Sequence, residues 1–476
     1  MTRSLLFRLS LFLAAIQGGG HPEVRGAEPP LREQAVQAMR KAAGFYRGRV
    51  ASHGGYAYYT RLDLKQRWGE GKLDADTIVV QPPGTPAVGM AYLEAFAATG
   101  DRFYLDAARE AAEALVAGQL ESGGWTQTIS FAPGKPVDRY RKRKGGAGKN
   151  ISSLDDGQTQ SAIQFLARVD KALDFRHAEI HEAALYAVDA LLKAQFPSGA
   201  FPQVWTGPVA AKPVVRARYP EGDWRSEGRV KDYWNCPTLN DNLASTVAET
   251  LIAVHQVYGD AKSRAALERL GDFLVLAQMP DPQPAWCQQY HPDTMAPIWA
   301  RKFEPPAVTG WESQGVMETL MRIARETGNK AYLDPIPRAL AYLKRSQLPG
   351  GRVARFYELK SNRPLFMDAD YQLTYDDSAA PSHYGWVQPS RLDGIEKAYR
   401  AAREGVAPRA EPARPSPLEV RRIIGELDAQ GRWVSTFAGE RLVGQPKLPM
   451  GLPYLSSEVF IDRLTTLARF VGDRPK

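Results

Sequence analysis

The sequence is poor in cysteine and lacks long hydrophobic segments. Its 476 residues include two cysteines, Cys236 and Cys287, so at most one disulfide can form. Both the paired and the unpaired state stay open, because pairing cannot be inferred from sequence alone. Beyond the N-terminal region no segment is apolar enough to cross a bilayer, and we expect no membrane span.

Signatures of zinc binding and of nucleic-acid binding are also missing. The seven histidines form no HExxH motif, and His177 and His181 are interpreted as residues of a solvent-facing helix. There is no zinc finger, basic zipper or aromatic RNA-binding motif, so we expect no nucleic-acid partner. The formal net charge of +8 nevertheless favours a polyanionic partner. An acidic polysaccharide is the partner that we expect.

Part of the positive charge lies in one run, RYRKRKGGAGK, at residues 139–149. Such a run is typical of a solvated, flexible loop. It could also form a basic flap over an anionic substrate, and the sequence leaves both interpretations open.

The first 27 residues have the pattern of a signal peptide. Arg3 precedes an apolar stretch from Leu5 to Ile16, which is too short to span a membrane and ends in glycines. We therefore expect residues 1–27 to be removed and the protein to be secreted or periplasmic.

A repeated unit dominates the middle of the chain. Each unit predicts a helix, a short turn, a second helix and an elbow rich in glycine and proline. The turn reads TGD at residues 99–101, YGD at 258–260 and TGN at 327–329. Glycine suits the left-handed position that ends a helix, and Asp or Asn can cap the next one. The units end at Trp125, Phe201, Trp286 and Arg352, after an N-terminal fragment that ends at Tyr56.

No single unit can bury its apolar face alone, so stacked hairpins must share a core. We therefore predict an all-α fold, an α/α barrel or toroid of helical hairpins, at residues 28–400. Small strand pairs could follow the elbows. A linker rich in proline and alanine is expected at 401–416, and a small helical C-terminal extension at 417–476.

Two predicted helices begin with acidic, amide-rich clusters, LDDGQT at residues 154–159 and TLNDN at 238–242. One interpretation is helix capping, in which Asp or Asn accepts hydrogen bonds from free backbone N–H groups. The alternative is a Ca²⁺ site, because ionised oxygens from two loops suit this cation. The occurrence of two such clusters at equivalent points of the repeat favours the functional interpretation.

Two further segments, 299–306 and 355–366, combine cations, aromatic residues and proline in loops. Guanidinium groups bind carboxylates through paired hydrogen bonds. Aromatic residues on the elbows could stack on sugar rings or pack in the core. The elbow aromatics are Trp125, Trp205, Trp286 and Tyr290.

Five motifs together resemble the polysaccharide lyase family 10 pectate lyases. They are LDDGQT, FPSGAFPQVW, TLNDN, ARKFEPPA and RFYELKSNRPLF, in this order, and the resemblance covers roughly residues 40–400. It implies an α/α barrel that cleaves polygalacturonate by Ca²⁺-assisted β-elimination. We expect the enzyme to act as a monomer.

The resemblance also implies roles for individual residues. Asp155 and Asp241 would be the calcium-associated carboxylates, and Arg301 would be the catalytic base. The expected substrate-binding residues are Lys302, Arg355, Arg363, Asn240, Asp156, Trp205 and Tyr357.

The chain departs from the family pattern at three places. Asp156 stands where the family usually has Asn, and Gln158 stands where it usually has a small residue. The insert at 207–231 is long. These departures bear on the ligand set and on the substrate more than on the fold.

Two other functions are consistent with the same residues. An inverting glycoside hydrolase on this architecture would use Asp155 and Asp156 as acid and base. A non-catalytic relative would bind oligogalacturonate without turnover. A terpenoid cyclase is disfavoured because the DxDD motif is missing.

Overall fold

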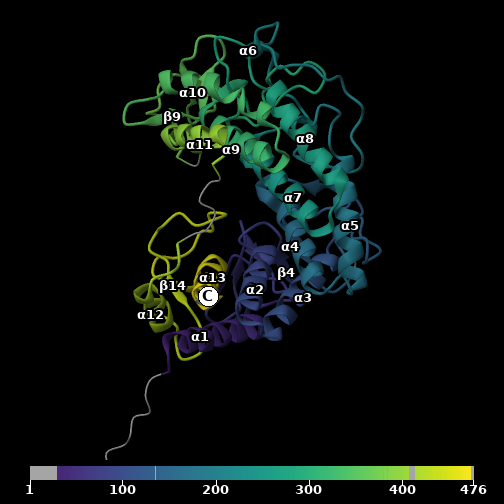
Figure 1. Ribbon diagram of the computed structural model, residues 1–476, viewed down its shortest axis with the longest axis vertical. Coiled ribbons are helices and arrows are strands. Elements are labelled where there is room, and N and C mark those ends of the chain that lie inside the picture. The colour runs from purple at the N-terminus through teal and green to yellow at the C-terminus, as the bar shows by residue number, and fades with distance from the viewer. Residues whose placement is uncertain (1–28, 135, 379, 383, 407–412, 473–476) are drawn as a thin grey trace, which may run out of the picture.

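The computed structural model describes residues 29–134, 136–378, 380–382, 384–406 and 413–472. The expected signal peptide lies outside the described residues. The repeat is confirmed as a series of helical hairpins (Figure 1). They are α2 (Thr85–Thr99) with α3 (Arg102–Ala117), α4 (Gln158–Ala172) with α5 (Ala178–Lys193), α7 (Leu243–Tyr258) with α8 (Ala261–Leu276), and α9 (Gly310–Thr327) with α10 (Ile336–Arg345).

The predicted turn chemistry is present in three of these hairpins. Gly100, Gly259 and Gly328 end α2, α7 and α9 with φ of 71°, 66° and 78°, values that a residue with a Cβ rarely adopts. The residue after each glycine then caps the next element, since Asp101 and Asp260 accept backbone N–H groups at the starts of α3 and α8. Asn329 does so for a short 3₁₀ turn, Lys330–Leu333, that precedes α10.

The first helices of successive hairpins pack against one another. α2 contacts α4, α4 contacts α7, and α7 contacts α9. Helix α13 (Ser457–Gly472) packs on α2 at one end of this row, and α11 (Leu392–Glu404) packs on α9 at the other. The row follows the arc that Figure 1 shows, from α13 through α4 to α11.

The elbows join one hairpin to the next through buried tryptophans. Trp125 donates its Nε1–H to the Leu115 carbonyl at the end of α3 (2.8 Å), and its backbone N–H to Thr159 in α4 (3.0 Å). Trp286 repeats this arrangement with the Leu274 carbonyl of α8 (2.7 Å) and with Ser313 of α9 (3.0 Å). Trp125 and Trp286 therefore pack in the core rather than on an open binding surface.

Short strands follow the elbows, so the fold is helix-rich but not purely α-helical. One antiparallel sheet has the order β12-β11-β10-β8, and three two-stranded sheets pair β13 with β9, β4 with β5, and β6 with β7. Their bounds are β4 (Thr77–Val79), β5 (Thr128–Ser130), β6 (Ser152–Ser153), β7 (Val204–Trp205), β8 (Ala307–Thr309), β9 (Arg352–Ala354), β10 (Phe356–Glu358), β11 (Pro364–Met367), β12 (Leu373–Thr374) and β13 (Val387–Pro389).

The C-terminal segment contains strands as well as helices and packs on the N-terminal part. A five-stranded antiparallel sheet has the order β14-β15-β1-β2-β3. Thus β15 (Pro453–Ser456) pairs with β1 (Tyr59–Arg61), and Tyr59 lies opposite Ser456. The other strands are β2 (Arg67–Trp68), β3 (Lys72–Leu73) and β14 (Val434–Thr436). Helix α12 (Pro417–Gly425) packs on α1 (Leu31–Phe45), which also contacts α13.

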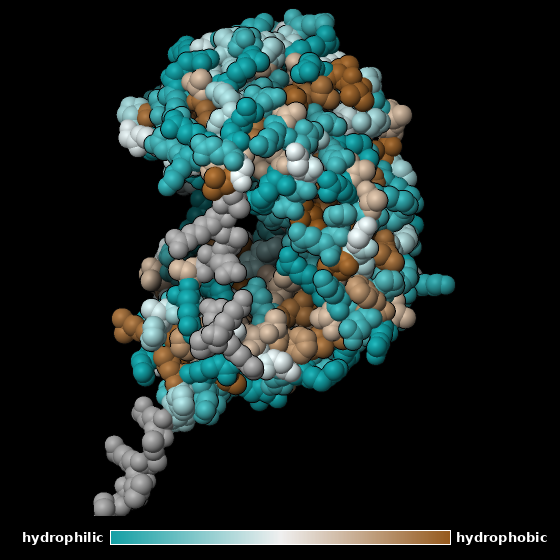
Figure 2. All heavy atoms as spheres, in the orientation of Figure 1, coloured by the Kyte–Doolittle hydropathy of each residue, from teal (hydrophilic) through white to brown (hydrophobic). Residues whose placement is uncertain are grey.

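The surface in Figure 2 is mostly hydrophilic. Among the described residues, no helix combines the length and the hydrophobicity that crossing a membrane requires. Cys236 and Cys287 are both buried and are not bonded to each other. Burial raises the pKa of the Cys236 thiol to about 11 and that of the Cys287 thiol above its usual range.

Candidate active site

The two acidic clusters have the same local structure. Each forms a single 3₁₀ turn, Asp155–Gly157 before α4 and Asn240–Asn242 before α7. The middle residue of each turn is left-handed: Asp156 has φ 43° and Asp241 has φ 52°. Asp and Asn tolerate this region better than most residues with a side chain, yet it still carries strain.

The left-handed conformation of these residues does not place a side chain in a capping position. No side chain caps either 3₁₀ turn or the helix that follows it. The carboxylates of Asp155, Asp156 and Asp241 are therefore left for another role. An unfavourable backbone conformation whose carboxylates cap no helix is typical of a functional site.

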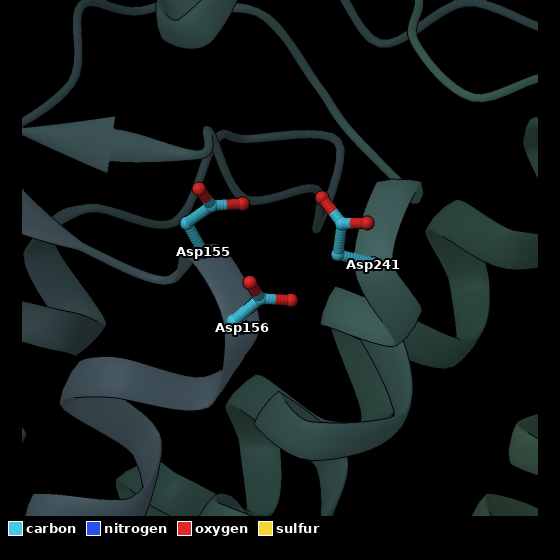
Figure 3. A group of neighbouring side chains, drawn as sticks. All are labelled: Asp155, Asp156 and Asp241. Atoms are coloured by element: carbon cyan, nitrogen blue, oxygen red, sulfur yellow. The ribbon is translucent and has the colours of Figure 1, made fainter. Parts of the chain in front are cut away.

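The turns bring the three carboxylates together. Each of Asp155, Asp156 and Asp241 offers an oxygen that lies within 4.8 Å of the others. Figure 3 shows Asp155 and Asp156 at one helix start and Asp241 facing them from the other. The side chains of Asp155 and Asp241 are 31% and 25% exposed, so the cluster is open to solvent on one side.

Burial and mutual repulsion disturb the ionisation of this cluster. Burial, followed by the charges of Asp155 and Glu70, raises the pKa of Asp156 to about 6. Burial and the charge of Asp155 also hold the pKa of Asp241 well above its usual range, against the opposing effect of Arg301. A bound divalent cation would remove this repulsion.

The polar side chains around the three carboxylates suit the binding of a hard cation. Gln203 donates to Asp155 Oδ1 (2.7 Å), and Gln81 donates to Asp156 Oδ2 (3.1 Å), which orients both carboxylates. Gln158 is 6% exposed, and its Oε1 is buried without a hydrogen-bond partner. Oxygen ligands in a flexible shell are what Ca²⁺ prefers, so the residues present fit this cation.

Arg301 joins the two clusters. Its Nη2 lies 3.5 Å from Asp155 Oδ1 and 3.7 Å from Asp241 Oδ2, and its Nε lies 3.8 Å from Glu304 Oε2. Burial alone would lower the pKa of the Arg301 guanidinium, but these three carboxylates outweigh it and raise the pKa. The predicted base and the predicted metal ligands therefore share one site.

Asn240 and Arg355 lie beside this site in a buried polar network. Arg355 pairs with Glu312 (3.0 Å) and lies over the Tyr384 ring, and its Nη2 donates to Asn240 Oδ1 (3.4 Å). Gln288 donates to the same Asn240 oxygen (3.0 Å). These contacts fix Arg355 next to the start of α7.

The other predicted substrate-binding residues are not in contact with the acidic cluster. Lys302 lies over the Tyr371 ring, and Arg363 lies over the Tyr375 ring. Trp205 is buried, and its Nε1 donates to the Ser122 carbonyl (2.9 Å). Tyr357 is fully buried, and its hydroxyl donates to the Ser346 carbonyl (2.7 Å).

The basic run is docked by ion pairs rather than fully solvated. Arg139 pairs with Glu121, and Arg141 pairs with Glu182 on α5. Arg143 donates to the Ser130 carbonyl (2.6 Å) at the end of β5. The positive charge of these three arginines is therefore partly committed within the chain.

Sequence reasoning missed two buried glutamates and the glutamines that orient the carboxylates. Glu304 and Glu312 are each 2% exposed and contact Arg301 and Arg355, respectively. A signal for Glu312 exists in the sequence, since it falls on the face of α9 that buries Val316 and Leu320. Gln203 lies within the FPSGAFPQVW motif, but no sequence pattern indicated that Gln81 or Gln203 would bind these carboxylates.

Comparison with known proteins finds a family match for part of the chain. Residues 132–353 match the family described as pectic acid lyase. This segment contains the first four of the five motifs, and the fifth begins two residues beyond it. The match supports the resemblance over these residues: this segment of the chain is similar to the pectate lyases.

Solved structures with similar folds include a family 10 polysaccharide lyase from Cellvibrio cellulosa. A mutant of it in complex with trigalacturonic acid is 19% identical over 68% of this chain and 99% of that one, with a TM-score of 0.46. A second structure of that lyase is 21% identical over 68% of this chain and 97% of that one, with a TM-score of 0.46.

A cellobiose 2-epimerase from Spirochaeta thermophila is 15% identical over 94% of this chain and 98% of that one, with a TM-score of 0.45. No match was found among curated protein sequences.

Proposed function

We propose that the protein cleaves polygalacturonate by Ca²⁺-assisted β-elimination on an α/α barrel, with Arg301 as the base. The observation that carries this proposal is the position of Arg301, whose guanidinium lies between Asp155 and Asp241 from two separate helix starts. The same site thus offers a cation-binding group and a nitrogen base.

β-Elimination requires removal of the proton at C5 of a galacturonate residue. Arg301 would take up that proton, the electron pair of the C5–H bond forms the C4–C5 double bond, and the bond from C4 to the glycosidic oxygen breaks as that oxygen takes up a proton from water. Asp155, Asp156 and Asp241 would hold Ca²⁺, which when bound supplies positive charge for the uronate carboxylate as the C5 proton leaves. Arg355, Arg363 and Lys302 are proposed to bind further substrate carboxylates.

Arg301 as a base faces one objection, because arginine is almost always protonated. The neighbouring carboxylates raise the pKa of Arg301 further. Once Asp155 and Asp241 hold a cation, their charge no longer favours the protonated arginine. The neutral fraction grows with pH, so turnover is expected to rise towards alkaline pH.

The close approach of the three carboxylates disfavours an inverting hydrolase. Inverting glycosidases keep their two carboxyl groups about 6.5–9.5 Å apart to admit a water molecule. Here the nearest oxygens of Asp155, Asp156 and Asp241 lie within 4.8 Å. This spacing suits shared binding of one cation better than an acid and a base on opposite sides of a sugar.

The proposal extends to where the protein acts. The signal-peptide pattern of residues 1–27 supports secretion or export to the periplasm, where polygalacturonate would be met. The formal charge of +8 supports binding of this polyanion. We propose that the enzyme acts as a monomer.

An assay with purified protein and polygalacturonate tests the function. The expected result is an ultraviolet-absorbing unsaturated product that appears with Ca²⁺ and disappears in excess EDTA. Full activity in EDTA would contradict the role of calcium. Binding of oligogalacturonate without any product would instead support the non-catalytic alternative.

A further inference from the structure

Glu304 is a buried carboxylate within the ARKFEPPA motif, and the proposed reaction does not use it. Its side chain is 2% exposed. A buried carboxylate is costly unless several groups bind it, so its position needs a physical reason. Its side chain bonds Arg301 and Asn240, in the two segments of the candidate active site, and Tyr384, which lies against Arg355.

One oxygen of Glu304 binds the turn that carries Arg301. Glu304 Oε2 accepts the Arg301 backbone N–H (3.2 Å) and lies 3.8 Å from Arg301 Nε. The Glu304 backbone N–H donates to the Arg301 carbonyl (3.0 Å), and the Glu304 carbonyl accepts the Ala300 N–H (3.0 Å). Residues 300–304, here called the Arg301 turn, are thus closed by the backbone and the side chain of Glu304.

The other oxygen binds groups outside the Arg301 turn. Glu304 Oε1 accepts Asn240 Nδ2 (3.2 Å) and the Tyr384 hydroxyl (3.3 Å). Asn240 is the residue before Asp241, in the 3₁₀ turn that precedes α7. Glu304 therefore connects the backbone that carries Arg301 with the helix start that carries Asp241.

We propose that Glu304 is a positioning residue that sets the location of the Arg301 guanidinium relative to Asp241. This inference rests on the proposed role of Arg301. The Glu304 carboxylate binds the backbone of Arg301 and the side chain of Asn240, the neighbour of Asp241, so it sets the distance between Arg301 and Asp241. Its charge lies beside Arg301 Nε. A displacement of about 1 Å at a reacting group can lower turnover by about 100-fold.

Glu304→Gln is the sharpest variant, because glutamine has the same shape. Its side chain offers one oxygen and one NH₂ group in place of two acceptors. If the oxygen faces Arg301 N–H, the NH₂ group meets the NH₂ donor of Asn240, and the bond to Asn240 is lost even if the Tyr384 hydroxyl turns to accept. If the NH₂ group faces Arg301 instead, the bond to the turn is lost.

The expected kinetic result is a fall of about 10- to 100-fold in kcat, with KM for polygalacturonate within about threefold of wild type. A merely structural role would lower the melting temperature without this split between kcat and KM. Tyr384→Phe removes one hydroxyl from Glu304 and should give a smaller fall in kcat. If the wild type cleaves polygalacturonate and Glu304→Gln has the same kcat, the proposal is overturned.

Hydrogen–deuterium exchange tests the same inference without any substrate. Glu304→Gln should speed exchange in residues 299–306 and leave α8 unchanged. Glu312→Gln is the matched control, since Glu312 has the same burial but binds Arg355 (3.0 Å) and Gln288 (2.8 Å). It should leave exchange in 299–306 at the wild-type rate.

These two readouts separate the failure of the inference from the failure of the proposed function. If the wild type shows no turnover, the proposed function fails, and the exchange rates alone decide the role of Glu304. Equal exchange in 299–306 for the wild type and Glu304→Gln would overturn the positioning role.

Discussion

At the scale of single residues, the left-handed turns decide how the acidic residues are interpreted. The sequence predicted Asp155 and Asp241 as metal-associated residues, but it left helix capping open. Neither residue caps a helix. In the two turns, Asp155 is equivalent to Asn240, and Asp156 is equivalent to Asp241. Positive φ at Asp156 and Asp241 could not be predicted, because it depends on how each turn joins its helix.

Asp241→Asn separates metal binding from backbone conformation. Asparagine tolerates the left-handed region about as well as aspartate, so the fold should be retained. We expect a loss of at least about tenfold in turnover on polygalacturonate, because one charged oxygen donor is removed. Calcium titration should show weaker binding, and the melting temperature should change little. Wild-type turnover would argue that Asp241 has only a local structural role.

Arg301→Lys tests the base at constant formal charge. A lysine ammonium has neither the planar fork nor the length of the guanidinium that contacts Asp155 and Asp241. We expect kcat to fall by at least about 100-fold, while oligogalacturonate still binds by calorimetry. Turnover within a few-fold of wild type, or a rate maximum below neutral pH, would remove Arg301 as the base.

At the scale of elements, the hairpins were predictable because their ends have a local cause. Gly259 and Asp260 are one such pair: the glycine ends α7, and the Asp260 carboxylate accepts the N–H groups of Lys262 (3.2 Å) and Ser263 (2.8 Å). The strands were not predictable in detail. Strands of two to four residues, such as β6, carry too few residues to show an alternating pattern.

Asp260→Ala should lower the free energy of unfolding by about 1 kcal/mol, because α8 loses its N-terminal cap. Asp260→Asn is the matched control and should lose much less. Burial tends to raise the pKa of Asp260, but the bonds from Ser263 and Lys262 outweigh it and lower the pKa.

Asp260 has a lower pKa in the folded state than in the unfolded state. Its contribution to the free energy of unfolding is therefore fully present when the pH is above the usual pKa of Asp. It is lost as pH falls through the folded pKa. The difference in stability between wild type and Asp260→Ala, measured by urea unfolding, should therefore shrink at strongly acid pH. A difference that stays constant with pH would contradict this account of the cap.

At the scale of the whole molecule, the hairpin repeat predicted a shared core, but not how the ends of the chain meet. The sequence predicted a linker and a C-terminal extension, because composition changes after about residue 400. The structure places β15 beside β1 and packs Phe460 and Leu464 of α13 in the main core. Such contacts between residues about 400 positions apart leave no local pattern in the sequence.

Removal of residues 413–476 tests this connection. The truncated chain would expose the edge of β1 and the face of α2 that α13 covers. We expect it to aggregate or to melt at least about 10 °C below the full chain, because a whole buried helix is lost. A truncated protein with the wild-type melting temperature would show that the segment is an independent appendage.

The central claim is that Asp155, Asp156, Asp241 and Arg301 form one site for Ca²⁺-assisted elimination. Mass spectrometry of the oligosaccharides released from polygalacturonate in the presence of Ca²⁺ tests it most directly. The account predicts a new end with a C4–C5 double bond, in products whose summed mass equals that of the parent chain. It predicts that Arg301→Lys forms these products at least about 100-fold more slowly. Products that together are heavier by one water molecule per cleavage would show hydrolysis and contradict the account.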